Sequence, residues 1–166
     1  MMMQETEAAG TAVSTRDFEP PATDKLVAFS LGDRRLGIPL RFVAEVHQLA
    51  AIAPAAMPGG GFVGHLDLRG KAVPVLDLRG ALGQPVRVWD PGMHFMIVVD
   101  GERRAAIAVD EVDGVVDGEI ASGDGGSAEA ATSCLGIART TGGLVTVVDA
   151  VGLTALAFKC ARGEAS

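Results

Sequence analysis

Three polar residues that could take part in chemistry alternate along one short stretch of the sequence. His65, Asp67 and Arg69 are separated by Leu66 and Leu68. In an extended strand this period of two places the polar side chains on one face and the leucines on the other. A histidine beside a carboxylate is the pairing used in general-base catalysis and around bound metals. A small metal-dependent hydrolase that uses His65 and Asp67 is therefore one hypothesis.

A charged surface stripe is the competing interpretation of the same residues. Side chains two positions apart on a strand are separated by about 7 Å, which suits a stripe as well as a catalytic pair. No serine or cysteine beside them stands in a recognisable nucleophile motif. The stretch is therefore more typical of a surface or an interface than of an active site.

Metal and nucleotide sites have no signature in this sequence. The histidines and cysteines are few and scattered, without a metal-ligand spacing or a Cys-x-x-Cys pair: His47, His65, His94, Cys134 and Cys160. The glycines do not form either of the phosphate-binding patterns that open a helix. We therefore expect no metal, no cofactor and no disulfide, and the two cysteines should be free thiols.

Two opposite charges in separate strand-like segments offer a different kind of site. Glu45 lies in an alternating segment that places Val43, Glu45 and His47 on one side, and Arg69 ends the stretch described above. Such a pair either anchors a binding face or forms an intramolecular ion pair. Because the remaining residues assemble no chemistry, a protein-binding module is the default functional class.

Short strands joined by glycine-rich turns are expected to position these residues. From Lys25 the chain alternates, with Val27, Phe29 and Leu31 facing a core, and 35–38 completes a hairpin. Residues 62–82 contain a near repeat, Leu-Asp-Leu-Arg-Gly at 66–70 and 76–80, which predicts two strands of one hairpin with its turn at 70–71. Pro74 predicts that the second of these strands lies at a sheet edge or contains a bulge.

The C-terminal half continues the same pattern. Segments 95–99 and 105–109 predict a hairpin whose first strand is central, and 135–138 with 144–148 predict a last hairpin. Residues 117–132 are rich in glycine, alanine and acids and predict a mobile surface loop. Asp149 is placed to cap a short helix over 150–158. The fold class is therefore mostly β, as small barrels or a sandwich.

Length and charge restrict the functional classes further. The chain has 166 residues, 48% hydrophobic and 21% charged, which is enough for one folded domain or two small subdomains. Its net charge of -7 disfavours nucleic acid and anionic membranes as partners. Residues 1–24 and 159–166 are expected to be tails, and neither a signal peptide nor a membrane span is evident. We therefore expect a soluble cytoplasmic protein.

Several of these segments, taken in order, carry a resemblance to a known family. The residues are the run 29–38 (FSLGDRRLGI), the run 43–46 (VAEV), the run 64–79 (GHLDLRGKAVPVLDLR) and the run 109–112 (VDEV). Together they resemble the CheW-like domain of bacterial chemotaxis coupling proteins over about residues 25–158. The central run is the specific part, and the closing hairpin and helix also resemble those of the family.

The resemblance implies a fold, partners and site residues. The implied fold is two packed five-stranded SH3-like β-barrels with a groove between them and a short C-terminal helix. The implied role is a non-enzymatic adaptor of a two-component signalling system, which couples the cytoplasmic tips of chemoreceptors to the histidine kinase CheA. By position, the resemblance implies partner binding by a set of charged and apolar residues: Val43, Glu45, Gly64, Asp67, Arg69, Val109 and Val112. Recruitment to membrane receptor arrays follows from these partners.

Two positions depart from the family pattern and leave alternatives open. Asp67 stands where the family usually has asparagine, and His65 stands where an apolar or small residue is usual. A carboxylate only accepts hydrogen bonds, whereas an amide also donates them. Partner choice can therefore differ, and a diverged scaffold of a non-chemotactic chemosensory pathway is the alternative within binding functions. The absence of kinase and receiver sequence predicts a stand-alone coupling protein.

Overall fold

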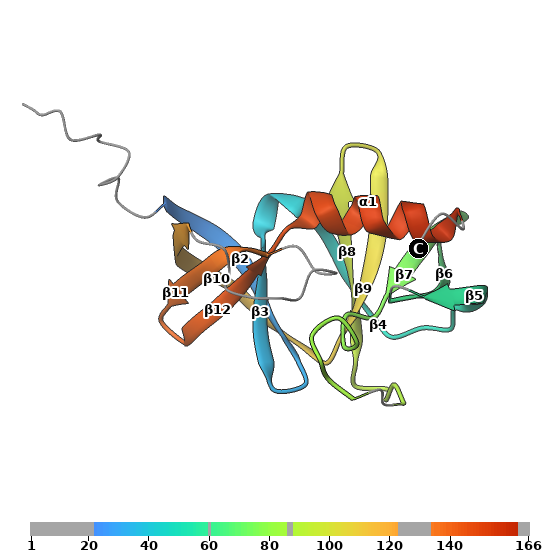
Figure 1. Ribbon diagram of the computed structural model, residues 1–166, viewed down its shortest axis with the longest axis horizontal. Helices are drawn as coiled ribbons and strands as arrows, with labels where there is room; N and C mark the ends of the chain where they lie inside the picture. Colours follow the sequence, from blue (N-terminus) through green and yellow to red (C-terminus); the bar gives the residue numbers. More distant parts are fainter. Residues whose placement is uncertain (1–21, 60, 86–87, 123–133, 163–166) are drawn as a thin grey trace, which may run out of the picture.

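The computed structural model of the chain describes residues 22–59, 61–85, 88–122 and 134–162, which form strands and one C-terminal helix. In chain order the elements are β2 (Ala22–Leu31), β3 (Arg34–Pro39), the 3-10 helix η2 (Leu40–Phe42), β4 (Val43–Gln48), β5 (Ala53–Gly59), β6 (Phe62–Leu68), β7 (Lys71–Leu76), β8 (His94–Asp100), β9 (Arg103–Val109), β10 (Glu111–Ser122), β11 (Cys134–Thr140), β12 (Gly143–Val148) and α1 (Ala150–Ala161). The strands form two subdomains that lie side by side (Figure 1).

The first subdomain is a closed barrel with the strand order β10-β11-β12-β3-β2. Antiparallel hairpins make most of it, and a short parallel pairing closes it, in which Thr146 of β12 faces Leu36 of β3. Leu26, Ala138 and Val147 fill a small interior. Closure leaves this barrel without a free edge among the described strands.

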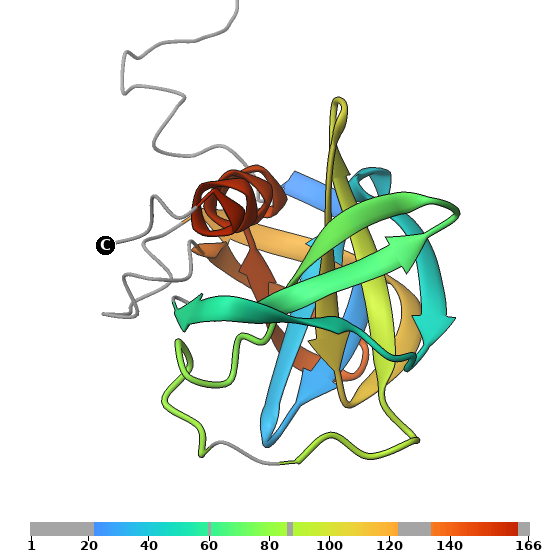
Figure 2. The same cartoon turned by 90° about the vertical axis from the view of Figure 1, so that its right-hand side faces the viewer.

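The second subdomain is a curled sheet of six strands in the order β4-β8-β9-β7-β6-β5. Strands β7 and β9 pair in parallel only at Val75 with Ala106 and at Leu76 with Ile107, and the other pairings are antiparallel. β4 and β5 are the two edges. Figure 2 views the molecule from this subdomain and shows β4 curving toward the β6–β7 hairpin. The inner face of the curl carries its own apolar cluster, which includes Leu66, Phe95 and Ile97.

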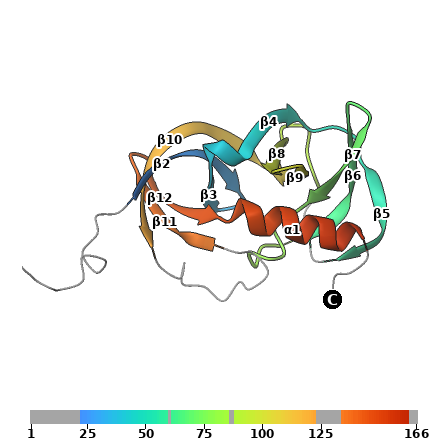
Figure 3. The ribbon, with the colours of Figure 1, turned by 90° about the horizontal axis from the view of Figure 1, so that it is seen from above.

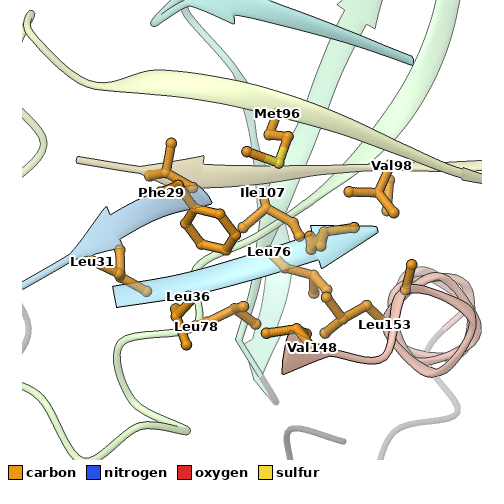
Figure 4. Packing of buried hydrophobic residues seen from close by; sticks show 14 of the residues in the cluster. Phe29, Leu31, Leu36, Leu76, Leu78, Met96, Val98, Ile107, Val148 and Leu153 are labelled. Atoms are coloured by element: carbon orange, nitrogen blue, oxygen red, sulfur yellow. The ribbon is translucent and has the colours of Figure 1, made fainter. Parts of the chain in front are cut away.

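One large core joins the two subdomains. It contains Phe29 and Leu36 from the barrel, Leu76 and Ile107 from the curled sheet, and Leu153 from α1. Figure 4 shows these side chains in contact between the two sheets. The helix leaves the barrel from β12 and crosses the curled sheet, packing on β6, β7, β8 and β9 (Figure 3). The apolar burial that stabilises each subdomain therefore depends on the other.

A buried ion pair also ties the subdomains together. Arg79, just after β7, is 2% exposed, and both of its terminal nitrogens donate to the carboxylate of Asp110, which links β9 to β10. Asp110 Oδ2 also accepts from the backbone N–H of Gly32 in the β2–β3 turn at 2.6 Å. The pairing holds the pKa of the Arg79 guanidinium above its ordinary value. The Asp110 side chain thus connects three chain segments: its own β9–β10 link, the segment after β7 that carries Arg79, and the β2–β3 turn.

The predicted mostly β class with two subdomains and a C-terminal helix is confirmed, with differences in detail. The second subdomain has six strands instead of five, and it is a curled sheet. The first strand begins at Ala22, before the expected boundary at Lys25, and the helix runs to Ala161, beyond Phe158. The predicted hairpins 95–99 with 105–109 and 135–138 with 144–148 are both present. Among the described residues, no helix is long and apolar enough to cross a bilayer.

Three local predictions are corrected. Pro74 does not mark an edge, because β7 pairs with both β6 and β9; its missing N–H is tolerated since the parallel pairing with β9 starts only at Val75. The bulge that was the alternative prediction is present beside Pro74, but the extra residue lies in the partner strand β6, between Phe62 and Gly64. Residues 117–122 belong to β10, which long-range pairing with β2 and β11 holds extended, and the rest of that predicted loop, 123–132, lies outside the described residues. Asp149 occupies the position before α1 but makes no side-chain capping hydrogen bond.

Candidate functional site

The β6–β7 turn places Arg69 in a backbone conformation that is rare for its residue type. Leu68 pairs with Lys71, so Arg69 and Gly70 form a two-residue turn, with φ values of 53° and 85°. Two successive positive φ values are typical of a type I′ hairpin turn, which favours asparagine and glycine. Among the described residues, Arg69 is the only residue other than glycine with positive φ. An arginine held there at a cost of roughly 1–2 kcal/mol points to a requirement for its side chain.

Asp67 supports this turn from the strand that precedes it. Its Oδ1 accepts the backbone N–H of Gly70 at 2.9 Å. The amide oxygen of asparagine can accept the same hydrogen bond, so the departure from the family pattern preserves the turn. The side chain of Asp67 is otherwise directed to the exposed face of β6.

The Arg69 guanidinium reaches across to Glu45 on edge strand β4. Nη1 donates to Oε1 at 3.1 Å, and Nη2 donates to Oε2, so the pair is bidentate. His47, two residues further along β4, donates from Nε2 to Oε1 at 2.7 Å. Arg104 of β9 completes the group, with Nη1 3.9 Å from Oε2. We call Glu45, His47, Arg69 and Arg104 the Glu45 cluster.

The electrostatics of the cluster keep Glu45 ionised. The hydrogen bonds from Arg69, and then those from His47, lower the pKa of Glu45 from 4.5 to about 2. The same interaction raises the pKa of Arg69. One carboxylate therefore faces two guanidinium groups and an imidazole, and the cluster carries a net positive charge at neutral pH.

The cluster bridges the open side of the curled sheet. Strand β4 and the β6–β7 turn share no backbone pairing, and the Glu45–Arg69 pair joins them. Two hollows lie beside it, each with an apolar floor. The first, of about 390 Å³, is lined by His47, Gln48, Leu49, Ala50, Leu66, Asp67, Leu68 and Phe95. The second, of about 240 Å³, is lined by Leu68, Arg69, Lys71, Val73 and Arg104. Apolar surface beside charged groups is typical of a protein-binding surface, in which an apolar centre is surrounded by a polar rim.

The other residues implied by the family resemblance lie at different depths. Val43 and Val112 are half-buried and pack on the core between the subdomains, whereas Val109 is fully buried there. Gly64 is buried in β6, where a Cβ would lie 2.2 Å from the carbonyl oxygen of Ala53. Glu45, Asp67 and Arg69 therefore form one surface, while the other four belong to the framework behind it.

His65 and Asp67 line one hollow, but their side chains have different partners. His65 is half-buried and packs edge-on against Phe62, with ring centroids 5.3 Å apart. Asp67 is bonded to the turn, and no hydrogen bond joins the two side chains. They line a hollow of about 290 Å³ together with alanines and Leu66. In the described part of the chain, no group of three or more potential ligands could hold a metal ion. The contacts of these side chains are those of a structural strand.

Two members of the Glu45 cluster were not singled out as binding residues from the sequence. His47 lies two positions from Glu45 on the same strand, so the period of two was a usable signal. Arg104 had no such signal, because its approach to Glu45 depends on the curl of the sheet. Glu45 and Arg69, which the sequence predicts to be either binding anchors or an ion pair, form an ion pair, and their role as binding anchors stays a prediction.

The fold and the site together define a class: a mostly β protein with a closed barrel and a curled sheet on one core, and an exposed ion-pair cluster. The model of the CheW-like domain family matches residues 25–157, and the chain belongs to this family. The fold is similar to the crystal structure of scaffolding protein TtCheW from Thermoanaerobacter tengcongensis. The TM-score is 0.65 at 24% sequence identity, covering 79% of this chain and 90% of that chain, a likeness of fold. The comparison with curated proteins gives no match.

Proposed function

We propose that this protein is a chemosensory adaptor that couples chemoreceptors to a CheA-type histidine kinase by binding alone. The observation that carries the proposal is the CheW-like domain over residues 25–157, which includes nearly all of the described fold. The similar Thermoanaerobacter protein is described as a scaffolding protein. The adaptor works in the cytoplasm and is recruited to membrane receptor arrays by these partners, without catalytic turnover of its own.

The Glu45 cluster is the part of the surface to which we assign coupling. The Arg69 side chain is 63% exposed, whereas that of Glu45 is 27% exposed. A partner protein can therefore reach the Arg69 guanidinium while the Glu45 carboxylate holds that guanidinium in place. Charges at the rim of an interface set the register and the rate of association. The strained turn under Arg69 supports the same assignment, because a turn selected for stability alone favours asparagine or glycine.

Capture of partners from the native host tests the proposal. Tagged wild-type protein, Arg69→Ala, Glu45→Ala and a control variant, Arg139→Ala, are used to capture proteins from lysate, which are then identified by mass spectrometry. Arg139 is a suitable control because it is 77% exposed and lies on the closed barrel, away from the cluster. We expect the wild type and the control to recover a CheA-type kinase and a chemoreceptor, and the cluster variants to lose one of them by about tenfold.

The fold of each variant is checked by circular dichroism and thermal unfolding. If the wild type captures neither partner from a lysate shown to contain both, the adaptor function is refuted. If Arg69→Ala and Glu45→Ala capture both as well as wild type does, the adaptor function stands and the assignment to the Glu45 cluster is refuted.

A further inference from the structure

A cationic hollow lies at the start of strands β7 and β9. Its lining consists of Arg69, Lys71 and Arg104 around a floor of Leu68 and Val73. The floor is nearly closed to solvent, with exposures of 8% for Leu68 and 3% for Val73. The lining thus contains three cations, no carboxylate, and apolar surface beneath them.

Strand geometry explains why the hollow exists. The parallel pairing of β7 with β9 begins at Val75 opposite Ala106, so Val73 and Arg104 lie two residues before the first paired residues. Ahead of that point the two strands are not joined by backbone hydrogen bonds, and the β6–β7 turn lies beside the gap. The strand geometry therefore sets the floor of the hollow, and the side chains of Arg69, Lys71 and Arg104 form its rim.

The charge balance around the hollow favours an anionic occupant. Glu45 neutralises part of Arg69 and approaches Arg104 at 3.9 Å, and it is the one carboxylate in ion-pair contact with either within the described ranges. Lys71 is exposed and has no ion pair with any described residue. An excess of positive charge here stands out because the whole chain carries a net charge of -7. Such a local reversal of sign attracts and orients a complementary charge.

The apolar floor decides which kind of anion fits. A small inorganic anion gains nothing from Leu68 and Val73, and a phosphate polymer is repelled by the net charge of the protein. A protein segment satisfies both features when a carboxylate side chain lies next to an aliphatic one. The carboxylate then meets the cations while the aliphatic group covers the floor, as at interfaces with an apolar centre and a charged rim.

We propose that this hollow receives an acidic segment of the partner protein, in which Asp or Glu neighbours a large aliphatic residue, and that Lys71 and Arg104 are partner-binding residues. The inference rests on the adaptor function proposed above and specifies the chemistry of its partner. Lys71, which has no ion pair with a described residue, would bind the partner's carboxylate directly. Arg69 and Arg104 would each interact with both Glu45 and that carboxylate.

Charge reversal provides the test, with a matched control on the same strand. Lys71→Glu and Arg104→Glu alter the hollow, whereas Arg103→Glu alters the adjacent residue, which faces away toward the Phe158 ring on α1. The probes are two purified proteins from the native host, the cytoplasmic signalling fragment of a chemoreceptor and the CheA-type kinase. Affinity is measured by calorimetry at low salt and at about 0.5 M salt, where surface charges are screened.

We expect wild type and Arg103→Glu to bind at least one probe equally, and Lys71→Glu and Arg104→Glu to bind that probe about tenfold more weakly with a smaller salt dependence. Binding of both hollow variants within about twofold of wild type overturns the inference while the adaptor function stands. Tighter binding by Lys71→Glu also overturns it, because the occupant is then basic. If wild type binds neither probe, the adaptor function fails and the inference fails with it.

Discussion

Removing the Arg79 side chain charge should destabilise the whole fold, not one subdomain. Arg79→Met keeps the length of the side chain but removes the guanidinium that pairs with the Asp110 carboxylate, which is 18% exposed. Breaking a buried ion pair from one side costs about 3–5 kcal/mol. A domain of this kind has about 5–15 kcal/mol of stability in total. The variant therefore loses about 30–50% of a mid-range free energy of unfolding of about 10 kcal/mol.

Chemical denaturation followed by circular dichroism measures this loss. Trp89, the single tryptophan, donates to Asp77 at 3.0 Å and gives a fluorescence probe near Arg79 for comparison. Arg139→Met is the control; its side chain is 77% exposed, and its pairing with Glu119 at 3.7 Å should contribute no more than about 1 kcal/mol.

A second variant separates the charge from the packing. In Arg79→Met combined with Asp110→Asn, the Asp110 charge that the single variant leaves without its guanidinium is also removed, so part of the lost stability should return. The reasoning is refuted if Arg79→Met costs no more than the Arg139→Met control, or if the double variant is less stable than Arg79→Met alone.

Three other predictions concern the core, the β5–β6 pairing and the Glu45 cluster. Leu153→Ala in α1, where the residue is 1% exposed, should lower the free energy of unfolding in denaturant by about 2–5 kcal/mol. A loss below about 1 kcal/mol would contradict the packing of α1 on the curled sheet. Gly64→Ala should cost about 1–3 kcal/mol because the new Cβ would lie 2.2 Å from the Ala53 carbonyl oxygen. An unchanged midpoint of denaturant unfolding would contradict this prediction, because it would mean that β5 moves away without cost. Because the pKa of Glu45 is lowered to about 2, its contribution to stability is complete above pH 4.5 and is lost as the pH falls toward 2. The difference in unfolding free energy between wild type and Glu45→Gln should therefore shrink over that range, and a constant difference would contradict the assignment.

Strand alternation was the most informative part of the sequence. The inward pattern of Val27, Phe29 and Leu31 is confirmed, since all three are buried in the core between the subdomains. The opposite face of the same strand was not predicted to be buried, yet Leu26 and Ala28 have no exposed surface. The reason is barrel closure, which gives β2 an interior on its second face, and closure depends on pairing with strands far along the chain.

The two copies of Leu-Asp-Leu-Arg-Gly show where local sequence stops being informative. The hairpin that the repeat predicts is present as β6 and β7. The arginine of the first copy, Arg69, lies in the turn and is 63% exposed at its side chain, whereas that of the second, Arg79, is 2% exposed. The difference arises because Asp110 lies opposite the second copy in the folded chain. The Glu45–Arg69 ion pair was one of two alternatives that the sequence offered, whereas the contacts of Arg104 with Glu45 and of Arg79 with Asp110 had no signal in the sequence.

The order of the strands has a consequence for synthesis of the chain. The closed barrel is assembled from strands within residues 22–39 and from β10, β11 and β12, which lie within 111–122 and 134–148, and the strands of the curled sheet lie between these two parts of the sequence. As the chain emerges from the ribosome, all six strands of the curled sheet are available before β12 exists to pair with β3. Strands β2 and β3 can pair with each other and β2 with β10, but the barrel stays open, with its interior uncovered, until β11 and β12 are made. Nascent chains halted before β12 are thus the form of this protein most exposed to aggregation and most in need of a chaperone.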